Sequence, residues 1–254
     1  MRTNLIKPGL KAGKSFIGTF SKTTDPAIVE VLALAGFEFT IIDNEHTSMN
    51  KESMVNLIRA AEIHNLPVTV RVRESSTADI LQALDAGALG VQVPQVESKA
   101  EAQKVVDAVK YAPLGKRGYA ASQRSARYGT MNPVEYAQLA NENSMVAVYC
   151  ETAASIDNLD EILSVDQVDI IFIGPFDLSQ ALGVTGQPSH PKVIDAIQMI
   201  TQKTRAAGKA AGIIAANPAQ TRQWLDMGIQ YIALSSDLAL ILNLGKQMLN
   251  ELGR

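Results

Sequence analysis

Two acidic residues stand at the ends of hydrophobic runs in this sequence. Glu151 directly follows Met145–Cys150, and Asp177 comes shortly after the next run. If the runs are neighbouring parallel strands, about 4.8 Å apart, the two carboxylates converge, and such hard oxygen ligands suit Mg²⁺ or Mn²⁺. In the structural alternative, Asp177 caps a helix that starts at Leu178, with Gln180 completing a capping box, and Glu151 lies in a solvated loop.

A buried arginine and a histidine are further candidates. Arg71 lies inside the apolar run Val68–Val72, where a charge needs a partner. That partner is either an acid of the protein or an oxyanion that develops during a reaction, and the pattern leaves both open. His46 follows Asp43 and Glu45, where an imidazole can act as a general acid or base. A solvated loop histidine is the alternative.

These residues are placed by hydrophobic runs that alternate with amphipathic stretches. The predicted strands are Phe16–Thr19, Phe39–Asp43, Val68–Val72, Gly90–Pro94, Met145–Cys150, Asp169–Ile173, Ala211–Ala215 and Tyr231–Leu234. The predicted helices are Pro26–Ala35, Lys51–His64, Ala78–Ala86, Lys99–Tyr111, Ala154–Leu163, Pro191–Ala207, Pro218–Met227 and Leu238–Leu252. Strands that are hydrophobic throughout are typical of parallel sheets buried on both faces. The regular alternation predicts an α/β fold, a (β/α)8 barrel formed as one domain by residues 1–254.

Glycines and one long irregular stretch punctuate this pattern. Glycines that supply a left-handed cap are expected directly after four helices, at Gly36, Gly87, Gly208 and Gly228. The stretch Ala112–Asn132 is interpreted as a loop at the C-terminal face of the barrel, where it would serve the active site or an interface. A surface excursion is the alternative.

Composition excludes several classes of function. The chain of 254 residues has a net charge of -3 and 5% aromatic residues, so neither a nucleic-acid surface nor an anionic-membrane surface is expected. The only cysteine, Cys150, cannot form an internal disulfide, and we interpret it as a buried small hydrophobe. With no apolar run of about 18 residues and no signal-peptide pattern, we expect a cytoplasmic protein outside the membrane.

Taken together, several segments resemble the HpcH/HpaI aldolase family, the class II pyruvate aldolases. Those enzymes include 4-hydroxy-2-oxoheptanedioate aldolase and 2-dehydro-3-deoxyglucarate aldolase. The matching segments are Asp43-Asn44-Glu45-His46, Arg71, Tyr111–Gly118, Glu151, Gly174–Ser179 and Ala206–Gly212. The resemblance runs from about Gly18 to Ser236. It implies a TIM barrel of the phosphoenolpyruvate/pyruvate type that cleaves a 4-hydroxy-2-oxo acid to pyruvate and an aldehyde through a metal-stabilised enolate.

The resemblance also implies a role for individual residues. Glu151 and Asp177 match the metal ligands for Mg²⁺, Mn²⁺ or Co²⁺. Arg71 matches the arginine at the keto oxygen, while His46 and Asp43 match the pair that transfers protons. The residues expected to bind the substrate are Arg71, Gly174, Pro175, Phe176, Asp177 and Ile214, with the carboxylate held by backbone amides around Phe176 and Asp177.

The family's assembly and one departure from its pattern complete the comparison. Asp85 matches an acid that reaches a neighbouring subunit's site, in a homo-oligomeric hexamer of dimers that exchange their last helix. Tyr149 and Cys150 stand where the family usually has glutamine and then valine or isoleucine. This departure leaves the metal ligands intact but puts the substrate preference in question. The acceptor aldehyde and the metal are not fixed by the sequence.

Other activities compete with this interpretation. A citrate-lyase-type enzyme acting on a coenzyme A thioester would use basic residues for the phosphates; the candidates are Lys116, Arg117, Arg124 and Arg127. A phosphosugar isomerase would need glycine-rich loops after strands seven and eight, and the sequence has none there. A Schiff-base aldolase would need a lysine near a strand's C-terminal end, whereas Lys209 precedes strand seven. A barrel that only binds a small acid is the remaining alternative.

Overall fold

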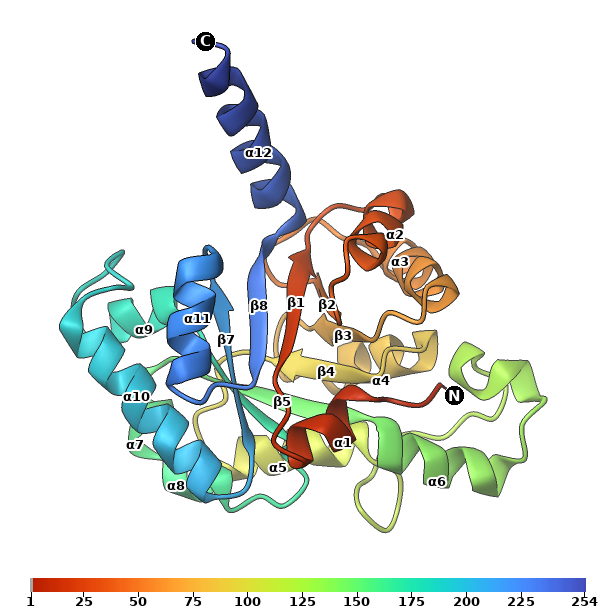
Figure 1. Ribbon diagram of the computed structural model, residues 1–254. Coiled ribbons are helices and arrows are strands. Elements are labelled where there is room, and N and C mark those ends of the chain that lie inside the picture. The colour runs from red at the N-terminus through yellow and green to blue at the C-terminus, as the bar shows by residue number, and fades with distance from the viewer. Residues whose placement is uncertain (1) are drawn as a thin grey trace.

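Eight parallel strands close into a barrel in the computed structural model, which describes residues 2–254 (Figure 1). Each strand pairs with the next along the chain, and β8 pairs with β1. The strands are β1 (Phe16–Ser21), β2 (Thr40–Asp43), β3 (Val68–Arg71), β4 (Gly90–Val93), β5 (Met145–Cys150), β6 (Ile170–Ile173), β7 (Ala210–Ala215) and β8 (Tyr231–Ser236). The predicted (β/α)8 barrel is confirmed, and all eight predicted strands are present.

The helices that alternate with the strands are also those predicted. They are α2 (Pro26–Leu34), α3 (Lys51–Ile63), α4 (Thr77–Ala86), α5 (Lys99–Val109), α7 (Ala153–Asp157), α8 (Leu159–Leu163), α10 (Pro191–Ala206), α11 (Pro218–Asp226) and α12 (Asp237–Glu251). The stretch predicted as one helix over Ala154–Leu163 is two, because Asn158 ends α7 and its side chain turns away to donate to the carbonyl of Glu97 at 2.7 Å. The four glycines expected to follow helices have positive φ values of 73 to 110°.

Four elements lie outside the predicted strands and helices. They are α1 (Ile6–Lys11), the 3₁₀ helix η1 (Arg124–Gly129), α6 (Pro133–Asn143) and α9 (Pro175–Ala181). Helix α6 carries a clear start signal: the side chain of Asn132 caps it, and proline takes its first position. The interpretation of Ala112–Asn132 as a loop at the C-terminal face is wrong. The stretch follows α5 and leads into β5, so it lies on the side of the barrel where strands begin.

The interior of the barrel is filled by large side chains. Phe39 and Tyr231 stack with ring centroids 3.9 Å apart, and Tyr149 stacks on Phe172 at 4.6 Å. Ile6 and Leu10 of α1 belong to the same buried cluster, so α1 closes the end of the barrel at which the strands start (Figure 1). The other end, where the strands finish, is left for a site.

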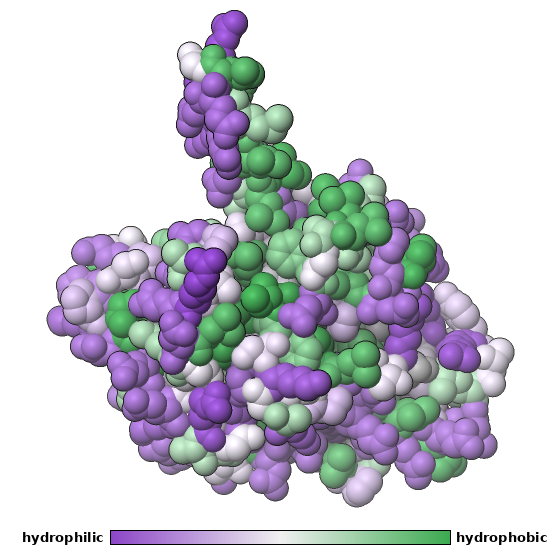
Figure 2. Space-filling model, viewed as in Figure 1, coloured by the Kyte–Doolittle hydropathy of each residue, from purple (hydrophilic) through white to green (hydrophobic). Residues whose placement is uncertain are grey.

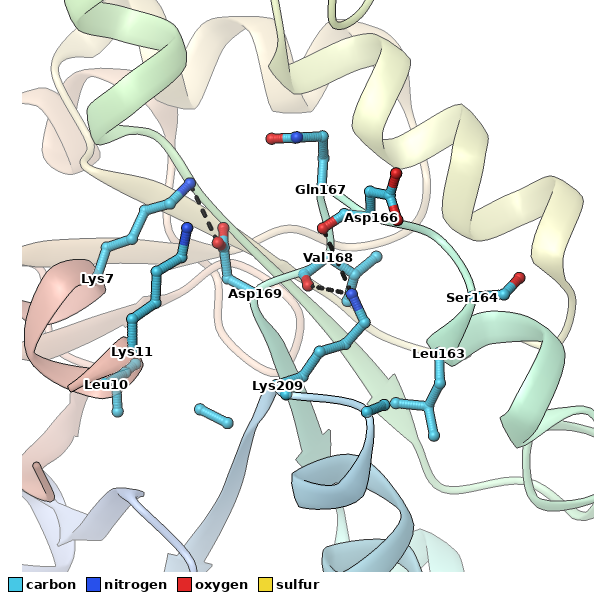
Figure 3. Close-up of a pocket in the computed structure, with 13 residues that line it drawn as sticks. Lys7, Leu10, Lys11, Leu163, Ser164, Asp166, Gln167, Val168, Asp169 and Lys209 are labelled. Atoms are coloured by element: carbon cyan, nitrogen blue, oxygen red, sulfur yellow. Dashed lines mark hydrogen bonds and ion pairs between the residues drawn. The ribbon is translucent and has the colours of Figure 1, made fainter. Parts of the chain in front are cut away.

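A polar cavity of about 320 Å³ lies at the closed end, beside α1 (Figure 3). Lysines 7, 11 and 209 line it, and Lys7 pairs with Asp169 at 3.1 Å. The Nζ atom of Lys209 donates to the carbonyls of Val165 and Val168, both at 2.8 Å. Lys209 therefore lies before β7, at the end of the barrel opposite to the C-terminal ends of the strands, and is not placed to form a Schiff base there.

Candidate active site

The candidate residues meet at the end of the barrel where the strands finish. Asp43 is the last residue of β2 and Arg71 the last of β3, and the two are directly paired in the sheet. Glu151 follows β5, and α9 begins two residues after β6 ends. The C-terminal ends of the parallel strands therefore bring Arg71, Asp43, Glu151 and the start of α9 to the same rim of the barrel.

Arg71 is the most strongly fixed side chain of this group. Its Nε and Nη2 atoms donate to the two oxygens of Asp43 at 2.9 and 2.8 Å, and Nη1 lies 3.0 Å from Glu45 Oε2. The guanidinium carbon also lies 4.9 Å from the centroid of the Phe20 ring. Arg71 thus pairs with acids of the protein, as the structural alternative held. A guanidinium has five N–H groups, so donors remain for a ligand.

The carboxylate of Asp43 accepts hydrogen bonds from several neighbouring groups. Beyond Arg71 it accepts from the backbone amides of Glu45 at 3.1 Å and His46 at 3.3 Å, and its side chain is fully buried. Burial alone would raise the pKa of Asp43, but the hydrogen bonds and charge of Arg71 outweigh burial and lower it. Asp43 is therefore a poor proton acceptor and a good anchor for Arg71.

The imidazole of His46 lies beside Glu45, while the backbone amide of His46 donates to the carboxylate of Asp43. Its Nε2 atom lies 3.7 Å from Glu45 Oε2, and 59% of the His46 side chain is exposed. Burial raises the pKa of Glu45, and the charge of Arg71 opposes that rise. The imidazole can thus reach solvent and a bound molecule, with Glu45 as the carboxylate beside it.

Glu151 is a buried acid with a raised pKa. The residue is 4% exposed, and its Oε1 atom accepts a hydrogen bond from the backbone amide of Gln95 at 3.0 Å. Burial raises the pKa of Glu151 to about 8, and the charges of Asp177 and Glu45 add to the rise. Among residues 2–254, no side chain forms an ion pair with Glu151 or Asp177.

Two backbone features that sequence reasoning missed hold Glu151 in place. Gln95 has a φ of 53°, in the left-handed region that residues other than glycine seldom adopt, and this turn aims its amide at the carboxylate. A Cβ atom added at Gly174 would lie 2.3 Å from Glu151 Oε2. A larger residue at this position would therefore displace the Glu151 carboxylate from its present place. Gly174 was named for its place in a motif, while no sequence signal distinguishes Gln95.

Asp177 lies in the first turn of α9. That helix begins at Pro175 with Gly174 as its N-cap, so the expectation that Asp177 caps a helix starting at Leu178 is wrong. Proline at the first helical position moves the start two residues upstream of Asp177. The side chain of Asp177 is exposed and makes no hydrogen bond within the described part of the chain. It is thus free to bind a ligand.

The donor set fits a hydrated divalent cation. No three His, Cys, Asp or Glu side chains of residues 2–254 lie close enough to form a complete protein cage. Glu151 is nevertheless a buried carboxylate held against like charges, and a cation between it and Asp177 would relieve that repulsion. Mg²⁺ commonly keeps several water ligands and takes only one or two carboxylates from the protein.

A cavity of about 660 Å³ extends from this rim across the ends of β6, β7 and β8. Phe176, Ile214, Ser236 and Asn243 are among the residues that line it. Tyr149 lies elsewhere, inside the barrel, with its hydroxyl donating to Gln92 Oε1 at 2.9 Å and its ring 5.9 Å from the Arg71 guanidinium. The departure at Tyr149 thus sits beneath Arg71, while Cys150 is buried, as predicted.

The remaining candidates lie outside this rim. Asp85, on α4, pairs with Arg117 at 2.6 Å. Of the other bases considered for coenzyme A phosphates, Lys116 pairs with Asp107 and Arg124 with Glu62. Three of those four bases are therefore occupied by acids of the same chain.

Comparisons with known proteins agree with this fold. The family profile described as HpcH/HpaI aldolase/citrate lyase matches residues 17–243. The chain is 36% identical over 239 residues to a 2-keto-3-deoxy-L-rhamnonate aldolase from Salmonella gallinarum (strain 287/91 / NCTC 13346), covering 94% of this chain and 89% of the relative. An HpcH/HpaI aldolase/citrate lyase family protein from Burkholderia cenocepacia J2315 superposes with a TM-score of 0.94 at 31% identity, over 99% of this chain and all of the other. The structure of a citrate synthase, SbnG, gives 0.87 at 31% identity, over 97% and 96%.

Proposed function

Because the chain belongs to the HpcH/HpaI aldolase/citrate lyase family, we propose that it cleaves a 4-hydroxy-2-oxo acid into pyruvate and an aldehyde. It is a metal-dependent aldolase, a carbon–carbon lyase. The observation that carries the proposal is the rim geometry: Arg71, held by Asp43 and Glu45, shares one barrel end with the acids Glu151 and Asp177.

Members of this family use a divalent metal. We propose that Glu151 and Asp177 hold Mg²⁺ or Mn²⁺ here, with Co²⁺ as a further candidate, and that water completes the coordination. When bound, the cation supplies a Lewis acid next to the keto and carboxylate oxygens of the substrate.

Residues of the chain itself hold the pyruvyl half. The amides of Phe176 and Asp177 in the first turn of α9 have no acceptor within the helix, so they suit the substrate carboxylate. Arg71 donates to the 2-keto oxygen, where negative charge develops as the C3–C4 bond breaks. Ile214, at the edge of the large cavity, provides an apolar wall.

Proton transfer at the C4 hydroxyl is assigned to His46. Its side chain is 59% exposed at this rim, and the carboxylate of Glu45 lies 3.7 Å from its Nε2 atom. Asp43 contributes by orienting Arg71, because its lowered pKa and full set of hydrogen bonds disfavour proton uptake. Of the two residues that match the family's proton-transfer pair, His46 is thus assigned to carry the proton and Asp43 to position Arg71.

Pyruvate release tests this function directly. The protein should release pyruvate from a panel of 4-hydroxy-2-oxo acids, and chelation should remove the activity, which added Mg²⁺ or Mn²⁺ should restore. A coupled lactate dehydrogenase assay follows the product. Metal-independent release, or no release from any member of the panel, would contradict the proposal. A coenzyme A thioester cleaved in its place would favour the citrate-lyase alternative.

The C-terminal helix gives a reason to propose a homo-oligomer. Helix α12 projects from the barrel instead of packing on it (Figure 1), and hydrophobic atoms run along one side of it and continue at its base (Figure 2). The exposed apolar residues on α12 that recur at helical spacing are Leu238, Ile241, Leu242, Met248, Leu249 and Leu252, each more than half exposed. Such a stripe is typical of a helix that buries one face against a partner. We propose exchange of α12 between subunits, within a hexamer.

A charge placed in this stripe should dissociate the assembly. Leu242→Asp is expected to lower the mass in solution towards that of one chain, 27.3 kDa, because Leu242 is 55% exposed in the single chain and a charge there would oppose burial against a partner. Light scattering at micromolar concentration measures the change, with Asn250→Asp on the same helix as the control. A wild-type protein that is already monomeric would refute the oligomer.

Two further expectations stay predictions. We propose that residues 1–254 form one domain and that the protein acts in the cytoplasm. Across residues 2–254, no helix is long and apolar enough to cross a membrane.

A further inference from the structure

A lysine not singled out from the sequence reaches the rim from the end of β1. Lys22 directly follows that strand, and its Nζ atom lies 3.5 Å from Asp43 Oδ2. Asp43 already accepts two hydrogen bonds from Arg71 and is fully buried. Lys22 therefore brings a second cation to a carboxylate whose charge Arg71 already balances, and 30% of the Lys22 side chain remains exposed to solvent.

An acid from the far end of the chain holds the backbone of Lys22. Asp237 Oδ2 accepts from the amides of Lys22 at 2.9 Å and Thr23 at 3.0 Å, and from the Thr23 hydroxyl at 3.0 Å. Asp237 is 2% exposed and is the first residue of α12. Within residues 2–254, the Lys22 ammonium itself makes no hydrogen bond, although it has three N–H donors. The cation is thus placed in advance and keeps its donors for a ligand.

The position of β1 fits the aldehyde half of the substrate. In a closed barrel of eight strands in chain order, β1 lies opposite β5, and the end of β5 leads to Glu151. The proposed pyruvyl site uses the ends of β3, β5 and β6. The cavity of about 660 Å³ continues from Phe176 to Ser236, the residue before Asp237. A substrate that extends from the pyruvyl site through this space runs towards β8 and β1.

We propose that Lys22 binds an oxygen-bearing substituent of the aldehyde half, a carboxylate or a hydroxyl, and so determines which acceptor is preferred. Asp237 is the positioning residue that fixes the loop from which Lys22 extends. Hydrogen bonds from an ammonium to oxygen are stronger than neutral ones, and an alkyl aldehyde offers the ammonium no partner beyond its carbonyl. This inference rests on the proposed aldolase function.

The test compares three aldehydes in the condensation direction with pyruvate: propanal, 2-hydroxypropanal and succinic semialdehyde. Lys22→Met keeps most of the length and removes the charge. We expect the ratio of KM for an oxygen-bearing aldehyde to KM for propanal to rise about 10- to 100-fold, the usual worth of a hydrogen bond to a charged group. Lys22→Arg should recover most of the preference. Asp237→Asn should shift the ratio the same way by a smaller factor. Lys99→Met, at the exposed start of α5, is the control.

Each outcome decides the question. A larger rise of the KM ratio for succinic semialdehyde identifies a carboxylate as the ligand of Lys22. A larger rise for 2-hydroxypropanal identifies a hydroxyl, and either result supports the proposal. A KM ratio that stays unchanged, including one in which KM for propanal rises by the same factor, overturns the proposal. Deuterium exchange into the pyruvate methyl group separates this failure from that of the aldolase function. If the wild-type protein exchanges and Lys22→Met leaves the ratio unchanged, only the assignment of Lys22 falls. If the wild-type protein does not exchange with metal present, the function itself fails.

Discussion

Glu151→Gln and Asp177→Asn are each expected to lower turnover by at least about 10³-fold, because a Lewis acid contributes several kcal/mol at the transition state. Glu151 is buried beside Gly174 and the Gln95 amide, so a glutamine there keeps the shape but loses the negative charge that a cation needs. Steady-state pyruvate release over a Mn²⁺ titration measures the loss.

Matched amide substitutions elsewhere separate ligand loss from general damage. Glu142 and Asp195 are exposed and make no ion pair in the described structure, so Glu142→Gln and Asp195→Asn should behave as the wild type. Equilibrium dialysis should show that Glu151→Gln and Asp177→Asn bind Mn²⁺ more weakly. A variant at either position that keeps wild-type turnover after chelation would remove that residue from the metal site.

Arg71→Lys is expected to lower kcat by about 10²- to 10³-fold, the usual cost of losing a preorganised donor to an oxyanion. Arg71 is held by both oxygens of Asp43 and by Glu45, and this planar arrangement aims the rest of the guanidinium. Lysine keeps the charge but has neither the fork nor the delocalised plane. If Arg71 mainly bound the ground state, KM would rise and kcat would stay the same.

Deuterium exchange into the methyl group of pyruvate isolates the step that Arg71 serves. The exchange needs the enolate but no aldehyde, so Arg71→Lys should slow it along with cleavage. Arg73→Lys, on the exposed segment after β3, is a matched control because among residues 2–254 Arg73 forms no ion pair and donates one hydrogen bond, to the backbone carbonyl of Asn44 at 3.3 Å. Normal exchange combined with impaired cleavage would move Arg71 to the acceptor half of the site.

The barrel was predictable because its signals are local and repeated. Eight hydrophobic runs and the helices between them were read from periodicity, and the runs end within two residues of the observed strands. Two of the missed elements, α6 and α9, begin with proline at the first helical position, which was the available signal. The stretch Ala112–Asn132 was assigned to the wrong end of the barrel. A loop that follows a strand lies at the C-terminal end, whereas this stretch follows helix α5 and lies at the other end.

The site was predictable where residue type carries the information. Arg71 and Glu151 are charged residues at strand ends, and Asp177 lies in the first turn of the helix after β6, so the fold makes all three conspicuous. Gln95 acts through a backbone amide and an unusual φ, so its residue type reveals nothing. Lys22 was missed because β1 was predicted to end at Thr19 and in fact continues to Ser21, which places the lysine at the strand end. Its partner Asp237 depends on a contact between distant segments.

The pairing of β8 with β1 has a consequence for how an active molecule forms. Phe16 pairs with Tyr231, so the sheet closes only after nearly the whole chain has been synthesised. Until then β1 lacks its pairing with β8. Contacts so distant in sequence are slow to form, because the chain must lose the entropy of closing the loop before these contacts can stabilise it. A partly folded barrel would hold Asp43 beside Arg71, because β2 and β3 are consecutive, yet would leave Lys22 unanchored until Asp237 arrives. Recovery of activity during refolding should therefore follow the slowest phase and lag behind the regain of helical signal.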